Sequence, residues 1–153
     1  IKFIMQKCYL ALGCFWKPEE TFRNIKGVVE TEVGYAGGKD KKVTYEEVCT
    51  GNTEHAETVK LTFDENFISF EKILEHFFTL HDPTQKDMQY PDVGTQYRSE
   101  IFYENEEQKK LAEKYKRLFD EKISGKIETK ISELKNYCKA EEYHQKYIMK
   151  RGL

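Results

Sequence analysis

The apolar residues of this chain alternate between two spacings, and this change limits the possible folds more than any other feature. Residues 58–63 alternate apolar and polar side chains, which is typical of a strand with one buried face. Residues 3–12 begin with apolar Phe3 and Met5 and continue in the apolar run 8–12, which predicts a strand that is buried at its end. Residues 70–78 carry apolar side chains at the i, i+3, i+4, i+7 and i+8 positions of an amphipathic helix. Because strand and helix patterns follow each other along the chain, we predict the α/β or α+β class.

The rest of the chain continues this alternation without repeats, linkers or low-complexity tracts, so we predict one domain over residues 1–153. Residues 81–98 show no periodicity, and we predict a long loop, which in compact domains is often functional. Ser69, and Asn105 with Gln108, are predicted helix caps. The other predicted elements are a helix from 17 to 27, strands at 28–35, 101–103 and 127–131, a helix from 105 to 125, and helical spacing over 140–148.

Composition and charge exclude some partners. The 25 Lys and Arg residues nearly balance the 27 Asp and Glu residues, and the net charge is −2. Sequence-independent nucleic-acid binding needs a basic face, so we expect no nucleic-acid partner. No apolar run reaches the roughly 18 residues of a membrane span, so we expect no membrane contact either. We expect a monomer. The sequence begins at Ile1 and not at Met, so the question of a removed leader peptide stays open.

The four cysteines are Cys8, Cys14, Cys49 and Cys138, and no two of them form a C-x-x-C pair. A secreted disulfide scaffold is shorter and richer in cysteine, so we expect reduced thiols and a cytoplasmic location. A free cysteine is most often a small buried apolar residue, and three of the four fit that interpretation.

Cys14 differs from the others in its position. It follows a predicted strand and Gly13, and it directly precedes a predicted helix. Unpaired amide groups at a helix N-terminus stabilise a thiolate, which is the reactive form of cysteine. Phe15 and Trp16 come next, and they could wall an apolar pocket or simply pack at the helix start. The pattern therefore indicates Cys14 as a candidate nucleophile with a lowered pKa, with a buried structural thiol as the open alternative.

The residues around Cys14 resemble a known family. Gly13-Cys14-Phe15-Trp16 is similar to the G-C-F-W signature of peptide-methionine (S)-S-oxide reductases, the methionine sulfoxide reductase A family. The resemblance covers nearly the whole chain. Its further segments are Val33-Gly34-Tyr35-Ala36-Gly37-Gly38, Thr44-Tyr45-Glu46-Glu47-Val48-Cys49, His55-Ala56-Glu57, His81-Asp82-Pro83, 92–99, and Ala140-Glu141 with Tyr143-His144-Gln145.

The resemblance implies a role for each matching residue. Cys14 would be the nucleophile, and Glu57 would bind and protonate the sulfoxide oxygen. Tyr45 and Tyr97 would orient that oxygen, with Asp92 supporting the polar side through water. From the residues alone, a solvated position at a strand end is the favoured interpretation of Glu57, and the tyrosines could be packing residues.

The resemblance also implies a fold, a substrate and a reductant. The fold is a two-layer α/β roll, with a mixed sheet flanked by helices. Phe15 and Trp16 would hold the methyl group of methionine-S-sulfoxide, free or in proteins. No cofactor is implied; an external thiol, from thioredoxin or from glutaredoxin and glutathione, would supply the electrons.

This chemistry explains why the site needs these residue types. The sulfur of a sulfoxide is electrophilic, but its oxygen leaves only after protonation, so the site needs both a thiol nucleophile and a proton donor. A carboxyl group beside aromatic rings can have a raised pKa and can therefore keep its proton near neutral pH. Glu57 is a candidate acid on this basis.

Three other functions remain open from the residues. His55-x-Glu57 is similar to the H-x-E of zinc deaminases, although the P-C-x-x-C partner is missing. His81 and His144 could join scattered cysteines in a metal site, although no pair has structural-zinc spacing. The chain could also be another thiol enzyme, such as a peroxidase or a Cys-His hydrolase, or a non-enzymatic module with an aromatic contact surface.

The chain departs from the family at two places. Lys17 stands where the family usually has glycine, which could change substrate access. Many members carry recycling cysteines after the Y-H-Q segment, but the sequence has no cysteine after Cys138. We interpret Cys49 as a buried structural residue and predict a loop around Cys138 that could move. We therefore favour Cys138 as the thiol that resolves the Cys14 sulfenic acid, with direct attack by an external thiol as the alternative.

Overall fold

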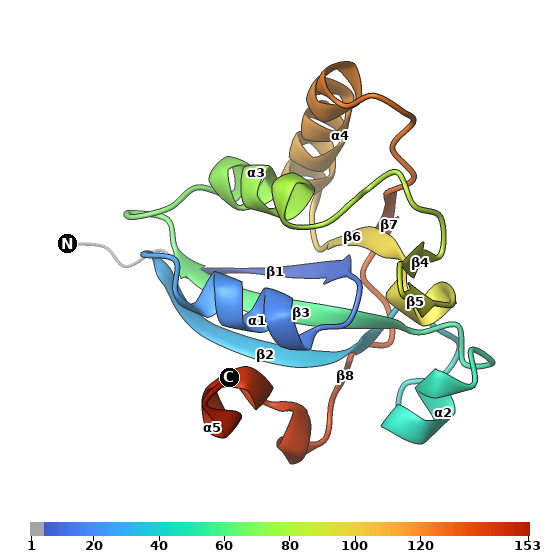
Figure 1. Ribbon diagram of the computed structural model, residues 1–153. Helices are drawn as coiled ribbons and strands as arrows, with labels where there is room; N and C mark the ends of the chain where they lie inside the picture. The colour runs from blue at the N-terminus through green and yellow to red at the C-terminus, as the bar shows by residue number, and fades with distance from the viewer. Residues whose placement is uncertain (1–4) are drawn as a thin grey trace.

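The computed structural model describes residues 5–153, which form a sheet with helices packed against it (Figure 1). The strands are β1 (Met5–Leu12), β2 (Val28–Ala36), β3 (Ala56–Asp64), β6 (Ser99–Tyr103), β7 (Lys130–Glu133) and β8 (Cys138–Lys139), with a separate small ladder of β4 (Met88–Gln89) and β5 (Asp92–Val93). The helices are α1 (Trp16–Arg23), α2 (Tyr45–Cys49), α3 (Phe70–Leu80), α4 (Glu106–Lys122) and α5 (Tyr147–Arg151), with short 3-10 helices η1 (Thr95–Tyr97) and η2 (Glu142–His144).

The six strands of the main sheet are hydrogen-bonded in the order β7-β6-β1-β3-β2-β8. The β6–β7 pair is parallel and the other pairs of this sheet are antiparallel, so the sheet is mixed, as predicted. Its two faces differ. Alternate residues Cys8, Leu10 and Leu12 of β1 join the main core, which contains Phe22 of α1 and the apolar side of α3. Tyr9 and Ala11 point to a smaller cluster on the other face.

The two predicted caps are present. The Ser69 side chain accepts a hydrogen bond from the amide of Lys72, and α3 begins at the next residue. The Asn105 side chain accepts one from the amide of Gln108 at the start of α4. Because these bonds satisfy amides that have no partner inside the helix, the sequence located both helix starts correctly. Phe3, the first residue of the predicted N-terminal strand, lies outside the described residues.

Several predicted elements are wrong in their bounds. The helix predicted from 17 to 27 ends at Arg23, and the loop predicted at 81–98 contains β4, β5 and η1. The strand expected at 127–131 begins only at Lys130, because the Ile127 amide is bound by Asp120 and the Glu128 amide by the Pro83 carbonyl. The helical spacing over 140–148 is divided into η2 and α5. Between them Lys146 has a left-handed backbone conformation with a φ of +51°, which interrupts the helix. The neighbouring Gln145 side chain bonds the backbone of β2 at Val33.

Candidate active site

Cys14 lies in the turn between β1 and α1, at the end of the sheet. The turn depends on Gly13, whose φ of +96° lies in a region that other residues rarely adopt. A Cβ atom at this position would also lie 2.9 Å from the side chain of Gln89. In this turn Cys14 is half-buried and forms no disulfide. It directly precedes Phe15, the N-cap residue of α1. The predicted strand–turn–helix position of Cys14 is therefore present.

Glu57 is buried beside this turn. It lies within β3, opposite Tyr35 of β2, and not at a solvated strand end. The amide of Phe15 donates a hydrogen bond to Glu57 Oε1 at 3.1 Å, and the Glu57 carboxyl group lies close enough to the thiol of Cys14 for each group to shift the pKa of the other. The carboxyl group and the thiol therefore lie side by side in the structure, although they are far apart in the sequence.

The environment changes the pKa of both groups. Burial raises the pKa of Glu57 to about 8, although the Phe15 amide acts to lower it. Burial first, and then the Glu57 carboxylate, raise the pKa of Cys14 to about 12, against the lowering effect of the Trp16 amide. At neutral pH the site therefore holds a protonated carboxyl group and a neutral thiol. The expectation of a lowered Cys14 pKa is therefore wrong for the site without substrate. Burial and the Glu57 carboxyl group raise this pKa more than the amides of the helix N-terminus lower it.

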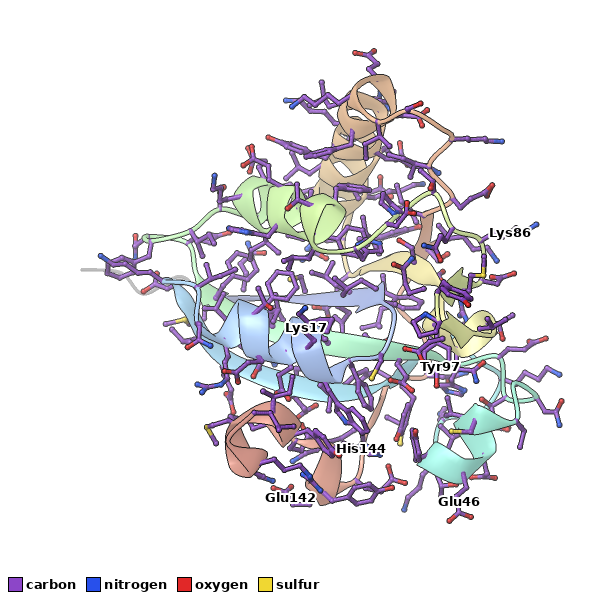
Figure 2. The ribbon with its side chains drawn as sticks, viewed as in Figure 1. Lys17, Glu46, Lys86, Tyr97, Glu142 and His144 are labelled. Carbon is purple, nitrogen blue, oxygen red and sulfur yellow. The ribbon has the colours of Figure 1, made fainter. Side chains whose placement is uncertain are left out.

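Two tyrosine hydroxyl groups lie near this pair. Tyr45 begins α2, which a capping box of Thr44 and Glu47 fixes at its start. Tyr97 ends η1, and Figure 2 shows it beside α2. Burial raises the pKa of each hydroxyl, and the Glu57 charge contributes to both shifts. Both tyrosines therefore stay protonated near neutral pH and can donate a hydrogen bond.

Asp92 and Cys14 line the same cavity, which has a volume of about 250 Å³. Leu80 and His81 form another part of its wall, and the exposed Lys17 lies at its rim. The charge of Asp92 adds to the factors that raise the pKa of Cys14 and of Glu57, so its carboxylate is close to both. A larger cavity of about 500 Å³, around Arg98 and Glu100, contains none of the predicted site residues.

Phe15 and Trp16 belong to an aromatic cluster. Phe15 is fully buried, with its ring centroid 5.8 Å from that of Tyr35. Trp16 is half-buried and stacks on Tyr147, with centroids 3.7 Å apart and planes at 7°. The indole N–H of Trp16 donates a hydrogen bond to Nδ1 of His144 at 3.0 Å. The two aromatic residues therefore lie beside Cys14 in fixed orientations.

The histidines do not gather into a metal site in the described part of the chain. Both ring nitrogens of His55 face backbone carbonyls, those of Thr53 and Asn136. His81 lies between the Phe77 carbonyl and the Ser99 hydroxyl, 2.7 Å from each. Within residues 5–153, no three His, Cys, Asp or Glu side chains are placed to hold one metal ion.

The comparisons with known proteins agree with this geometry. The model of the family described as "Peptide methionine sulfoxide reductase" matches residues 6–152. A peptide methionine sulfoxide reductase MsrA from Pelagibacter ubique is 58% identical over 147 residues, which cover 96% of this chain and 100% of that protein. The chain belongs to the peptide methionine sulfoxide reductase family.

Two solved structures similar to this chain have the same fold. The reduced form of Mxr1 from Saccharomyces cerevisiae superposes with a TM-score of 0.93 at 37% identity, covering 97% of this chain and 86% of that one. Mxr1 in complex with Trx2 matches with a TM-score of 0.68 at 26% identity, covering 96% and 89%. The predicted α/β roll with its mixed sheet is therefore confirmed.

The sequence analysis is wrong about the surroundings of two cysteines of this reductase, Cys49 and Cys138. Cys8 is buried as expected, but Cys49 is exposed at the end of α2, where its thiol bonds the Tyr45 hydroxyl. Cys138 does not lie in a loop. It forms edge strand β8, opposite Tyr35, and its thiol contacts the Val43 carbonyl at 3.6 Å. Cys138 and Glu57 both pair with Tyr35, so strand β2 lies between Cys138 and the strand that carries Glu57.

Sequence reasoning missed the structural contacts of two residues that hold the site together. Glu141 accepts hydrogen bonds from the Tyr45 amide and from the Tyr35 hydroxyl, both at 2.8 Å. His144, considered above only as a possible metal ligand, lies among the rings of Phe15, Trp16 and Tyr45. Both belong to the matching C-terminal motif, which was the only available signal. Their partners lie about a hundred residues away, and no local pattern reveals such contacts.

Proposed function

We propose that this protein reduces methionine-S-sulfoxide, free or in proteins, to methionine, with an external thiol as the reductant and without a cofactor. The observation that carries the proposal is the contact between the Cys14 thiol and the buried Glu57 carboxyl group. A nucleophile and an acid in contact are what oxygen transfer from a sulfoxide requires. The family membership of the chain supports the same reaction.

The pKa values favour a proton relay through Glu57. The carboxyl proton passes to the sulfoxide oxygen while the thiol proton of Cys14 passes to the carboxyl group. The sulfur of Cys14 attacks the sulfoxide sulfur and forms a transient S–S bond. The hydroxyl group then moves from the substrate sulfur to the sulfur of Cys14, the S–O bond of the substrate and the transient S–S bond both break, and the thioether leaves. The balance is Cys–SH plus R₂S=O giving Cys–SOH plus R₂S, so the substrate is reduced and Cys14 is oxidised to a sulfenic acid. No free thiolate has to accumulate, which agrees with the raised pKa of Cys14.

The two tyrosines orient the sulfoxide oxygen in this proposal. Each keeps its hydroxyl proton, and the Glu57 charge acts on both, so the three donors surround one small region. Hydrogen bonds that strengthen as negative charge develops on oxygen lower the barrier. Asp92 lies on the cavity side of Cys14 and supports the polar side of the site through water.

Phe15 and Trp16 form the apolar side and receive the methyl group on sulfur. With the thiol, the oxygen donors and the apolar wall on three sides, a sulfoxide sulfur has only one productive orientation. We therefore assign the S epimer as the substrate. Mixed-epimer methionine sulfoxide with dithiothreitol provides the test: the S epimer is consumed and the R epimer remains, and equal consumption of both overturns the assignment.

A second thiol must return Cys14 to its reduced form. We keep Cys138 as the proposed resolving thiol, because β8 is a two-residue edge strand and its few pairings separate at low cost. Condensation of Cys14–SOH with Cys138–SH forms a disulfide and releases water, and a thioredoxin-type dithiol then reduces the disulfide. The exposed Cys49 is the competing candidate, and glutaredoxin or glutathione could attack the sulfenic acid directly.

The other thiol chemistries are separated by one assay series. The purified protein is given methionine sulfoxide, hydrogen peroxide and a small ester in parallel, with dithiothreitol as reductant. We expect Cys14-dependent turnover of the sulfoxide far above the other two substrates. Faster turnover of peroxide or ester, lost in Cys14→Ser, would replace the proposed reaction with a peroxidase or hydrolase reaction.

A further inference from the structure

His144 makes a contact that the reaction above does not use. The ring is 1% exposed, and its Nδ1 accepts the indole N–H of Trp16 at 3.0 Å. The two residues are 128 positions apart in the sequence, so the bond joins the first turn of α1 to the C-terminal segment. Trp16 is also the only tryptophan of the chain.

This bond allows only one protonation state of His144. An indole N–H can only donate, so Nδ1 must carry a lone pair and the neutral ring must hold its proton on Nε2. Protonation would place an N–H on Nδ1, opposite the N–H of Trp16, and the bond would be lost. His144 Nε2 has no hydrogen-bond partner among the described residues, so no acceptor favours the cation at that side of the ring.

The surroundings of His144 are mostly aromatic. Its ring centroid lies 4.5 Å from that of Tyr45, 5.3 Å from Phe15 and 4.1 Å from Tyr143. It therefore lies between the proposed methyl wall, Trp16, and a proposed oxygen donor, Tyr45. The ring of Tyr147 stacks on the Trp16 indole. Trp16 thus has two contacts that set its orientation, one stacked ring and one hydrogen bond.

The charged and titratable groups around His144 come from three segments. Glu141, just before η2, acts to raise its pKa, and Arg151 of α5 acts to lower it. The neighbouring Tyr45 and Tyr143 have raised pKa values and stay neutral near pH 7. Burial outweighs Glu141, so the pKa of His144 is lowered from its usual value, and the neutral form persists at neutral pH.

We propose that neutral His144 is a positioning residue for this reaction: its Nδ1 holds the Trp16 indole in the orientation that receives the substrate methyl group, and protonation of His144 releases Trp16. The proposal rests on the function proposed above, because it assigns Trp16 to the substrate. The arrangement makes substrate binding sensitive to acid, through a group that does not touch the reacting atoms.

Two variants separate the hydrogen bond from the aromatic packing. In His144→Asn, the amide oxygen lies where Nδ1 lies and accepts the indole N–H, but it does not titrate. In His144→Phe, the ring is kept and the acceptor is lost. At about pH 7.5 we expect KM to rise about tenfold in His144→Phe with kcat changed less than about threefold, and both parameters to stay within about threefold of wild type in His144→Asn.

Fluorescence of Trp16 reports the contact without any turnover. In wild type we expect the emission to change as the pH falls below the usual histidine pKa of about 6.5, and we expect no such change in His144→Asn or His144→Phe. Wild-type KM should rise over the same pH range, and KM of His144→Asn should not. Far-UV circular dichroism and thermal unfolding establish that each variant is folded.

The outcomes distinguish this proposal from the proposed function. Active wild type with the same fluorescence transition in all three proteins, or with an equal KM in all three, overturns the role of His144. Wild type that reduces no sulfoxide but shows the His144-dependent fluorescence transition overturns the proposed function and leaves the hydrogen bond in place. If His144→Phe does not fold, the fluorescence and KM profiles of His144→Asn against wild type still decide the question.

Discussion

The backbone amide of Phe15 donates a hydrogen bond to Oε1 of Glu57 at 3.1 Å, and this bond joins the start of α1 to strand β3. A helix N-terminus has amides without intrahelical partners, and a carboxyl group from a neighbouring strand satisfies one of them here. The same carboxyl group contacts Cys14. One side chain therefore fixes the helix start and places an acid beside the thiol.

Replacement of the nucleophile should abolish turnover. In Cys14→Ser the side chain keeps its size and its hydrogen-bonding capacity but cannot accept oxygen to form a sulfenic acid. Because Cys14 is half-buried at a turn, we expect the unfolding free energy to change by less than about 1 kcal/mol. Methionine production from methionine-S-sulfoxide measures the effect. Sustained turnover by folded Cys14→Ser would exclude Cys14 as the nucleophile.

Removal of the acid should slow the chemical step. Glu57→Gln keeps the shape and a hydrogen-bond donor but has no transferable proton, so we expect the single-turnover rate to fall about 10²–10⁴-fold. The wild-type rate should decrease as the pH rises through about 8, because Glu57 then loses its proton. That alkaline limb should be absent from Glu57→Gln. A variant rate within about twofold of wild type would remove Glu57 from the acid role.

The same carboxyl group should make the stability depend on pH. Its pKa is raised by folding from 4.5 to about 8, so between these values the folded state keeps a proton that the unfolded state has lost. The bound proton stabilises the folded state fully below pH 4.5. As the pH rises from 4.5 to about 8 this contribution is lost, and the free energy of unfolding falls by roughly 3–5 kcal/mol in total. Urea unfolding at several pH values measures this loss. Glu57→Gln should unfold with a flatter pH profile, and an identical profile would contradict the raised pKa.

The resolving thiol can be found from one turnover without reductant. If Cys138 resolves Cys14, wild type loses two thiols, and Cys138→Ser accumulates a sulfenic acid that reacts with dimedone. Cys49→Ser is the matched control and should still lose two thiols. Peptide mass spectrometry of the product then shows a Cys14–Cys138 link. Sulfenic acid accumulating in Cys49→Ser instead would transfer the role to Cys49, and loss of one thiol in all proteins would assign the step to an external thiol.

Gln145 should be important for the attachment of the C-terminal segment. Its buried amide group accepts a hydrogen bond from the Val33 amide and donates to the carbonyls of Val33 and Ala140. Gln145→Leu leaves these backbone groups without partners, so we expect the unfolding free energy to fall by about 2–4 kcal/mol. Thermal and urea unfolding measure the loss. Gln145→Glu keeps the acceptor but faces two carbonyls with a buried carboxyl group, so it should also be destabilised at neutral pH. Wild-type stability of both variants would exclude this role.

Much of the fold follows from local patterns. The apolar patterns of β1 and β3 and the helical spacing in α3 depend on how each element is buried, and that information lies in neighbouring residues. The caps Ser69 and Asn105 act within one helical turn, so they too were predictable. Helix α2 was missed as an element, because five residues are too short to show a helical period.

The chain itself determined the strand–glycine–cysteine–helix turn and the combination of motifs that identifies the family. Only the tertiary structure decided how the side chains act on one another. Burial beside Glu57 reverses the expected pKa shift of Cys14, and the exposure of Cys49 and the pairing of Cys138 in β8 depend on distant strands and helices. The His144 contact with Trp16 likewise depends on segments 128 positions apart. Desolvation and long-range hydrogen bonds arise only once the chain has folded, so no local sequence pattern contains them.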